Sequence, residues 1–294
     1  MVHDGASEAG LDATPEAPSA LPAPGRYDGI GRLYGDEGLQ RLQASHVMVV
    51  GLGGVGSWTV EALARSGVGR LTLVDLDEIC LGNTNRQLHT LTTTVGRSKA
   101  EVLAERVHAI DPGCQVEAVV DFFTASSAAE LLDRRPDVVV DAIDSPRAKV
   151  ELVVRCRERG MALVVCGGAG GRIDPLALRR GDLAESGGDG LLRGLRRALR
   201  VREPSLGAGP WGLPAVWSVE PQRWPDGQGC VSTVPPAGGR SRRLDCAEGF
   251  GAATMVTGSF GFALAALAVE QLLAQASGRI GPGAKTGGAP GEIG

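Results

Sequence analysis

The 294-residue sequence is short of aromatic residues, histidine and net positive charge. Phe, Trp and Tyr make up 4% of it, there are 4 His, and the formal net charge is −4. Residues 1–24 hold four acidic residues and no Lys or Arg, so the rest of the chain carries 30 basic and 30 acidic residues. This balance excludes a basic nucleic-acid-binding domain, and any RNA surface must be a local patch.

The cysteines are scattered, and neither a C-x-x-C pair nor a secretory signal accompanies them. They are Cys80, Cys114, Cys156, Cys166, Cys230 and Cys246. This usage is typical of reduced thiols, so we expect a cytoplasmic protein. Cys114, Cys156 and Cys166 are expected in the core. Cys230 and Cys246 remain weak candidates for a reactive thiol, because no His lies near them in sequence to activate one.

The two ends of the chain differ in composition from its middle. Residues 1–24 are rich in Ala, Pro, Gly and acidic residues and lack apolar periodicity, and residues 278–294 are Gly-rich. Such segments cannot bury enough apolar surface to fold. We expect both to be disordered tails.

The most informative stretch begins with the apolar run Val47–Val50 and the loop Gly51-Leu52-Gly53-Gly54-Val55-Gly56. A helical pattern follows, and then a second apolar run that ends in Asp75-Leu76-Asp77. A glycine loop between strand and helix lets the backbone approach a phosphate, and the helix N-terminus favours the phosphate charge. An acid about 20 residues later can hold ribose hydroxyls. The pattern predicts a nucleotide site at Gly51, Gly53, Gly54, Gly56 and Asp75.

Two cations after this stretch favour ATP over a nicotinamide dinucleotide. Arg86 lies in Asn83-Thr84-Asn85-Arg86-Gln87, and Lys99 follows Gly96-Arg97-Ser98. Negative charge builds on the transferring phosphorus and the leaving diphosphate during nucleotidyl transfer, and a cation pair stabilises it. We expect both residues in exposed loop or helix-start positions.

Strand and helix patterns alternate through the first half of the chain. The expected elements are a helix over 35–43, strands over 47–50 and 71–74, a helix capped by Ser98, a strand over 115–120, a short helix capped by Ser127, a strand over 137–142, a helix capped by Ser145 and a strand over 161–166. The alternation predicts an α/β fold with a doubly wound, mostly parallel sheet. Asp144 and Gly167 then share one rim with the glycine loop.

The pattern changes after Gly171. Residues 191–202 read as an arginine-rich helix, residues 204–248 as an irregular region with a strand over 215–219, and residues 249–273 as a long apolar helix. Phe250–Ala268 carries no charge, so a membrane span must be weighed. Its small and hydroxyl residues, and the absence of a flanking basic cluster, favour a helix buried in a soluble protein.

Several segments together resemble the ubiquitin-activating-enzyme superfamily of adenylyltransferases. They are Arg32–Gly35, Val50–Trp58, Asn83–Gln87, Asp141–Ser145, Gly167–Gly171 and Gly249–Met255. The last two resemble the tRNA threonylcarbamoyladenosine dehydratase branch of that superfamily. The resemblance covers about residues 26–275 and implies a Rossmann-like fold of the ThiF type. It divides the chain into an ATP-binding half, 25–175, and a substrate and dimerisation region of the same domain, 176–277.

The resemblance also implies roles for individual residues. Asp144 would hold Mg²⁺ on the phosphates, and Arg86 and Lys99 would act in catalysis. The further ATP contacts would be Asp75, Asp77, Asn83 and the glycine loop. Arg32 would cross the interface of a homodimer to reach the partner's ATP. Asp141 is expected to face the opposite polar end of the sheet.

The resulting expectation is ATP-dependent dehydration of N6-threonylcarbamoyladenosine in tRNA through an acyl-adenylate. Possible tRNA contacts are Arg172 and the helix arginines Arg193, Arg196, Arg197, Arg200 and Arg202, because a row of cations can follow a phosphate backbone.

Three alternatives stay open. An adenylyltransferase for a ubiquitin-like sulfur carrier shares the nucleotide residues, although the Gly167 loop and the absence of C-x-x-C pairs disfavour it. A nicotinamide oxidoreductase is disfavoured by Arg86 and Lys99, and a non-catalytic binding module would not need Asp144. Zinc-binding relatives carry two C-x-x-C pairs, so we expect no zinc. The sequence leaves open an association with a cysteine desulfurase or sulfur carrier, as in some relatives.

Overall fold

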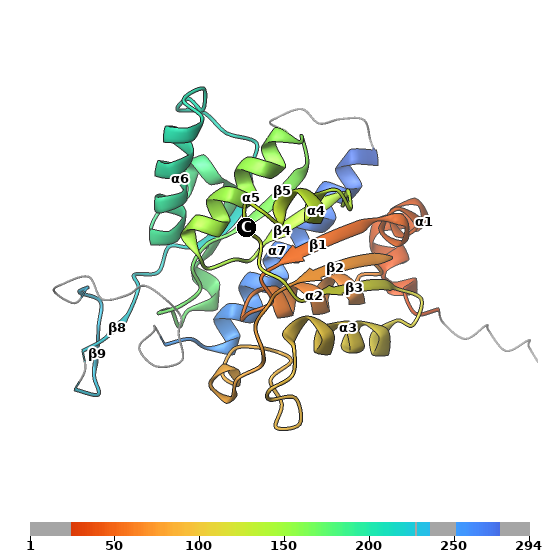
Figure 1. Ribbon diagram of the computed structural model, residues 1–294, viewed down its shortest axis with the longest axis horizontal. Coiled ribbons are helices and arrows are strands. Elements are labelled where there is room, and N and C mark those ends of the chain that lie inside the picture. Colours follow the sequence, from red (N-terminus) through yellow and green to blue (C-terminus); the bar gives the residue numbers. More distant parts are fainter. Residues whose placement is uncertain (1–24, 227, 236–250, 277–294) are drawn as a thin grey trace, which may run out of the picture.

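Seven strands form one sheet in the computed structural model, which describes residues 25–226, 228–235 and 251–276 (Figure 1). The strands are β1 His46–Val50, β2 Arg70–Val74, β3 Gln115–Val119, β4 Val138–Asp141, β5 Ala162–Cys166, β6 Leu178–Asp182 and β7 Pro214–Ser218. Their order is β3-β2-β1-β4-β5-β7-β6, and only β6 pairs antiparallel, against β7. A separate hairpin joins β8 Trp224–Pro225 to β9 Val231–Ser232.

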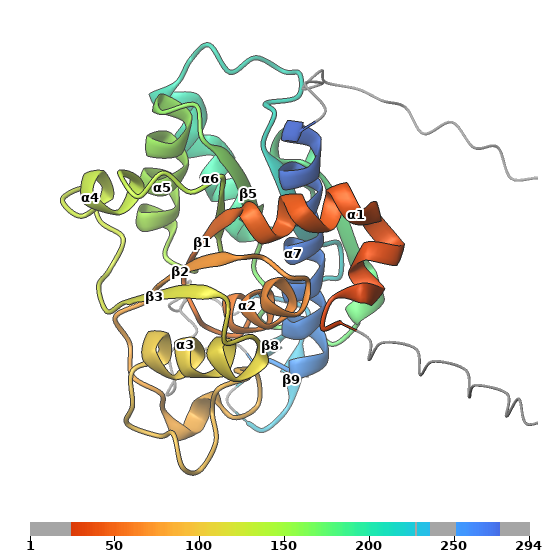
Figure 2. The same cartoon turned by 90° about the vertical axis from the view of Figure 1, so that its right-hand side faces the viewer.

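Helices cover both faces of the sheet. They are α1 Asp28–Ala44, α2 Gly56–Arg65, α3 Lys99–Ile110, α4 Ala128–Leu132, α5 Pro146–Glu158, α6 Gly190–Arg202 and α7 Thr254–Ala276. Residues of α1, α2, α3 and α7 share one apolar core with alternate strand residues, and those of α4, α5 and α6 share another (Figure 2). Strands buried on both faces read as continuous apolar runs, which is why β1, β4 and β5 were easy to predict.

The chain reverses direction across the sheet between β1 and β4. From β1 it proceeds outward through β2 and β3, and from β4 it proceeds the other way through β5. The loops after β1 and β4 therefore diverge at a topological switch point, where ligands bind in open α/β sheets. The glycine loop follows β1 and Asp144 follows β4, so the candidate residues lie at this switch point.

The long apolar helix α7 lies in the core and packs closely on α2. A Cβ on Gly261 would lie 2.6 Å from Trp58 Cβ and 2.7 Å from the Val55 carbonyl oxygen, and Thr59 Oγ1 donates to the Gly261 carbonyl. The helix is long and apolar enough to cross a membrane, yet 61% of its apolar window is buried inside the protein. Its small residues serve close helix packing, as the sequence suggested.

The predicted fold class is confirmed, while several details differ. The antiparallel edge strand β6 was not predicted, and α7 begins at Thr254 rather than Gly249. Ser98, Ser127 and Ser145 are the N-cap residues of α3, α4 and α5 as predicted, but only the Ser98 side chain accepts a capping hydrogen bond. β5 pairs with β7, so the sheet runs across the expected boundary at 175/176. The two expected tails lie outside the described residues.

Candidate nucleotide and substrate site

The first glycine loop is shaped by contacts that exclude side chains at two positions. Gly51 has φ +88°, and a Cβ there would lie 2.8 Å from the Ala142 carbonyl oxygen. A Cβ on Gly56 would lie 1.8 Å from the Gly51 carbonyl oxygen. At Gly53, by contrast, a Cβ would meet only Gln87 Nε2, at 3.8 Å. The loop is thus fixed at its ends and open at Gly53, which suits the approach of a phosphate.

Asp75 fixes this loop from the end of the neighbouring strand β2. Its Oδ2 accepts a hydrogen bond from the Leu52 N–H at 2.6 Å, and its Oδ1 accepts one from the Asp77 N–H at 2.9 Å. Burial raises the pKa of Asp75, and the Lys99 ammonium 4.0 Å away opposes the rise. Each carboxylate oxygen keeps a further lone pair, which suits a ribose hydroxyl.

Lys99 is buried, whereas we expected it to be exposed. Its side chain is only 7% exposed, and its Nζ lies 2.6 Å from Asp77 Oδ2. Lys99 starts α3 directly after its cap, Ser98, and the Lys99 N–H donates to the Asp77 carbonyl, so the helix start holds the lysine over the two aspartates. The structure therefore joins Asp75, Asp77 and Lys99 in one cluster.

Arg86 lies beside the middle of the glycine loop. A Cβ on Gly54 would lie 3.3 Å from Arg86 Cγ, and the Arg86 guanidinium donates to the Gly82 carbonyl and to Asn85 Oδ1. The Arg86 carbonyl accepts from Trp58 Nε1 and Thr257 Oγ1, which ties it to α2 and α7. The two helices thus hold the backbone of Arg86 next to the glycine loop.

Asn83 and Gln87 flank Arg86 and are both buried. The side-chain oxygen of Asn83 accepts from the Cys80 N–H at 3.0 Å and so supports the turn before Arg86. Gln87 Oε1 has no hydrogen-bond partner within the described part of the chain. A buried polar atom without a partner is rare, so its place beside the open Gly53 fits a bound polar ligand.

Asp144 and Asp141 follow the same strand and have opposite environments. Asp144 is exposed and makes no ion pair or hydrogen bond within the described residues. Asp141 is fully buried, with its Oδ2 2.8 Å from Nζ of the equally buried Lys149 on α5. The expectation that Asp141 faces the other end of the sheet is therefore wrong. An open carboxylate at the phosphate rim is a fitting donor for Mg²⁺.

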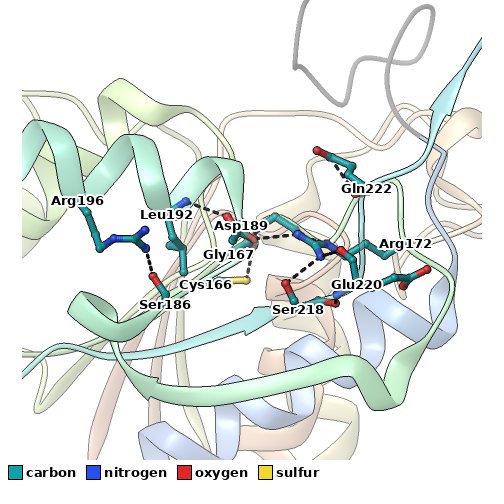
Figure 3. A network of polar contacts seen from close by, with 12 residues as sticks. Cys166, Gly167, Arg172, Ser186, Asp189, Leu192, Arg196, Ser218, Glu220 and Gln222 are labelled. Atoms are coloured by element: carbon teal, nitrogen blue, oxygen red, sulfur yellow. Dashed lines mark hydrogen bonds and ion pairs between the residues drawn. The ribbon is translucent and has the colours of Figure 1, made fainter. Parts of the chain in front are cut away.

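A second glycine loop, Gly167–Gly171, follows β5 on the same rim. Several side chains bind its backbone, including Asp189 and Gln222 from distant segments (Figure 3). Arg172 donates to the carbonyls of Gly168, Ser218 and Glu220 and pairs with Asp189 Oδ2 at 3.2 Å. The side chain of Arg172 is 2% exposed. A tRNA phosphate cannot reach it in this arrangement, which corrects the expectation of an RNA contact.

The helix α6 begins next to this second loop and carries the expected arginines. Some of them have partners within the protein and others do not. The Arg196 guanidinium bonds to Ser186 Oγ, Arg200 lies over the Trp211 ring at 5.2 Å, and Arg202 pairs with Glu151. Arg193 and Arg197 are exposed and have no hydrogen bond or ion pair within the residues described. They are four residues apart, hence on one face of the helix.

Arg32 and the cysteines lie outside the clusters just described. Arg32 is exposed on α1. The α1 helix starts after Tyr27, whose hydroxyl donates to the Ala64 carbonyl at the far end of α2 from the glycine loop. Cys114, Cys156 and Cys166 are buried as expected, and burial raises their thiol pKa values to about 11, 12 and 12. Cys230 is exposed, and Cys246 lies outside the described residues.

Sequence reasoning missed Lys149 and Asp189, each of which belongs to an almost fully buried ion pair. Asp189 had a local signal, because it precedes an apolar-periodic helix and caps it by accepting from the Leu192 N–H at 2.8 Å. Lys149 had none, since a lysine in a helix normally faces solvent.

Comparison with known proteins agrees with this geometry. The ThiF family model matches residues 28–182. The tRNA threonylcarbamoyladenosine dehydratase of Escherichia coli K12 is 44% identical over 254 residues, covering 86% of this chain and 95% of that protein. The solved structure of the E. coli tRNA N6-threonylcarbamoyladenosine dehydratase in complex with ATP has a TM-score of 0.75 at 41% identity, covering 86% of this chain and 96% of the other.

The similarity to a sulfur-carrier activating protein is narrower. The sulfur carrier protein adenylyltransferase of Thermus thermophilus is 40% identical over 111 residues, which are 38% of this chain and 41% of that protein. The shared part is thus short, whereas the dehydratase similarity spans both glycine loops. By fold, site and extent of similarity, the chain belongs to the ThiF family and, within it, to the tRNA threonylcarbamoyladenosine dehydratases.

Proposed function

We propose that the protein uses ATP to dehydrate N6-threonylcarbamoyladenosine carried on tRNA. The observation that carries this proposal is the presence of two glycine loops on one rim of the sheet. The first, after β1, is open and flanked by Arg86 and Asp144. The second, after β5, belongs to the segment that distinguishes the dehydratase branch. A rim with both loops can bring a nucleotide and a modified base together.

The chemistry begins with a carboxylate, which is a poor acyl electrophile. An oxygen of the threonyl carboxylate bonds to the α-phosphorus of ATP, and the bond to diphosphate breaks. A nitrogen or oxygen of the same modification then bonds to the acyl carbon, and the bond to AMP breaks. The substrate loses one water in total, and ATP becomes AMP and diphosphate. Ring closure is intramolecular, so orientation supplies much of the rate.

The residues of the first loop divide the work in this proposal. Asp75 binds the ribose, and the loop amides bind phosphate. Arg86 and Lys99 stabilise the charge that grows on the α-phosphate and the leaving diphosphate. Asp144 would hold Mg²⁺, which supplies further neutralisation of the phosphates. To contact the phosphates, the Lys99 ammonium would give up part of its contact with the Asp77 carboxylate.

In this proposal, the tRNA binds outside the nucleotide site, on α6. Arg193 and Arg197 are the cations of α6 that are not engaged within the described residues, so they are the phosphate contacts that we propose. Arg196 and Arg200 have structural partners and contribute less. Contacts of this kind give affinity without reading sequence.

We also propose a homodimer with Arg32 donated to the partner's nucleotide. The helix that carries Arg32 starts at the far end of α2, which itself spans about 15 Å at ~1.5 Å per residue. Large apolar side chains of α1 and α7 are exposed to solvent and could form the dimer interface. The exposed fractions are 69% for Leu33, 65% for Met255 and 51% for Phe262. Light scattering that finds an active monomer would remove this part of the proposal. A cysteine desulfurase or sulfur-carrier partner stays untested.

One assay tests the proposed function directly. The purified protein is incubated with ATP, Mg²⁺ and tRNA bearing the modification, and both AMP and digested nucleosides are measured by mass spectrometry. We expect AMP to form in step with a nucleoside lighter by one water. Calorimetry is expected to show binding of ATP and none of NAD⁺. AMP formed only with a ubiquitin-like carrier, or an unchanged nucleoside, would refute the proposal.

A further inference from the structure

The second glycine loop is held in place by one buried ion pair. Arg172 contacts the loop at the Gly168 carbonyl, and Asp189 Oδ2 accepts from the Gly168 N–H at 2.9 Å. Both polar groups of Gly168 are therefore bound by the two members of the pair. Figure 3 shows Arg172 and Asp189 approaching each other from the loop and from the start of α6.

The same two side chains connect the loop to its surroundings. Arg172 also donates to the carbonyls of Ser218 and Glu220, at the end of β7, at 2.9 and 2.6 Å. Asp189 uses its other oxygen to cap α6. The ion pair thus joins the loop, the end of the sheet and the helix that carries Arg193 and Arg197.

Stability alone does not account for such a pair. The side chains of Arg172 and Asp189 are 2% and 1% exposed, and removing two charges from water costs about as much as their attraction returns. What the pair does supply is a defined conformation. A five-residue loop with four glycines has few side chains to pack and high conformational entropy, so hydrogen bonds to its backbone decide its shape.

Close packing shows that this shape is tightly defined. A Cβ on Gly167 would lie 2.7 Å from Asp189 Oδ2, and a Cβ on Gly171, at φ +73°, would lie 2.7 Å from Gln222 Cγ. Gly168, between them, has only ordinary contacts, the nearest at 3.8 Å. The ends of the loop are therefore fixed, while Gly168, which faces the start of α6, could take a methyl group without a clash.

We propose that Arg172 and Asp189 are positioning residues for the tRNA-borne substrate. They fix the position of the Gly167–Gly171 loop relative to the arginines of α6. This inference rests on the proposed function. Gly168 is the partly exposed residue of the loop, so it forms the wall against which the modified base lies, and α6 holds the adjoining phosphates. Loss of the pair shifts the wall relative to the helix, so the enzyme binds tRNA less well while its ATP site is unchanged.

The test uses Arg172→Lys and Asp189→Asn in the full chain. Asn preserves the cap of α6, since Asn caps helices as well as Asp does, but it removes the charge that faces Arg172. We expect the KM for modified tRNA to rise by about tenfold to a hundredfold, the range that small misplacements produce. We expect the KM for ATP and the affinity for ATP by calorimetry to stay as in the wild type.

Gly168→Ala is a second variant that does not disturb the pair. Its added methyl group has room in the folded protein, at 3.8 Å from Asp189 Oδ2 and 3.9 Å from Leu191 Cβ, so it narrows the space between the loop and the start of α6 and should raise the KM for tRNA alone. Lys149→Met is the matched control, because it breaks the other buried ion pair, beside the Asp144 loop, and should impair ATP binding first.

Unchanged tRNA kinetics in both Arg172→Lys and Asp189→Asn would overturn the inference. Equal losses for ATP and tRNA would also overturn it, because a general structural role produces that result. If either variant fails to fold, Gly168→Ala decides, and wild-type tRNA kinetics in it count against the loop as a wall. A wild-type enzyme that converts no modified tRNA would instead refute the proposed function itself.

Discussion

The two glycine loops of this protein lie on one rim and are built in opposite ways. Gly51–Gly56 is shaped by its own backbone, by the neighbouring strands and by the nearby carboxylate of Asp75. Gly167–Gly171 is shaped by Arg172 at its own end and by Asp189 and Gln222, which lie 21 and 52 residues from the loop residues that they bind. The first loop keeps polar groups available, whereas the second has many of them bound within the protein.

The difference fits what each loop would recognise in the proposed function. Phosphate is a small anion with high charge, and free backbone N–H groups with one or two cations suffice to bind it. A modified base on RNA is larger and is recognised by shape, stacking and hydrogen bonds. Such a surface has to keep its shape before the substrate arrives, so its polar groups are used internally.

The largest expected effect concerns the buried ion pair beside the first loop. Lys149→Met leaves Asp141 buried without its cation, and we expect the free energy of unfolding to fall by about 3–5 kcal/mol. Lys149→Met combined with Asp141→Asn should recover part of the loss. Arg155→Ala, which breaks a partly exposed pair with Glu151, should cost at most about 1 kcal/mol. Urea denaturation measures the free energy of unfolding of all three variants. Equally small losses of stability in Lys149→Met and Arg155→Ala would contradict the expected effect of burial.

Arg86→Ala is the sharpest change at the first loop itself. Removing one preorganised charge contact should lower the rate of AMP formation by about 10²–10³-fold. The fold should be retained, since the guanidinium bonds only to its own segment. Arg65→Ala, at the opposite end of α2, is the control and should leave the rate unchanged. Normal turnover in Arg86→Ala would show that Arg86 beside this loop does not act in adenylation.

Lys99→Ala should reduce stability as well as activity, because Lys99 is buried over Asp75. Burial already raises the pKa of Asp75, so ionised Asp75 opposes folding at neutral pH, and losing Lys99 raises that pKa further. We expect a loss of about 1–3 kcal/mol at neutral pH that shrinks as the pH falls through the raised folded-state pKa of Asp75, which lies above the ordinary Asp range. Thermal melts across pH measure this, and a pH-independent loss would point to packing instead.

The smallest expected effect lies on α6. Changing Arg193 and Arg197 together to Ala should weaken tRNA binding and reduce its salt slope by roughly 1.5 units, at ~0.7–0.9 per phosphate contact. Affinity for ATP should not change. The matched pair is Arg179→Ala with Arg180→Ala on β6, which removes the same charge elsewhere. Binding isotherms at several salt concentrations compare the two, and equal slopes would mean that general charge, not α6, holds the RNA.

The contrast between the loops also decides what the sequence could reveal. The first loop, Asp75 and Asp144 were predictable because strand, turn and helix lie consecutively and each residue follows a strand end. The pairing of Arg172 with Asp189 was not, because it joins two segments that meet only after β6 and β7 fold back beside β5. Arg172 therefore looked like a surface cation when read from its neighbours. The burial of Lys99 was missed for a related reason, since its partners lie 22 residues away.

We propose that the first loop takes ATP and the second takes the modified base. The most direct test measures ATP affinity and the KM for modified tRNA side by side in Arg86→Ala and in Gly168→Ala. We predict opposite outcomes, with weakened ATP binding at a nearly normal tRNA KM in Arg86→Ala, and normal ATP binding with a raised tRNA KM in Gly168→Ala. If each variant loses both properties to the same extent, the two loops do not divide the work and the account is wrong.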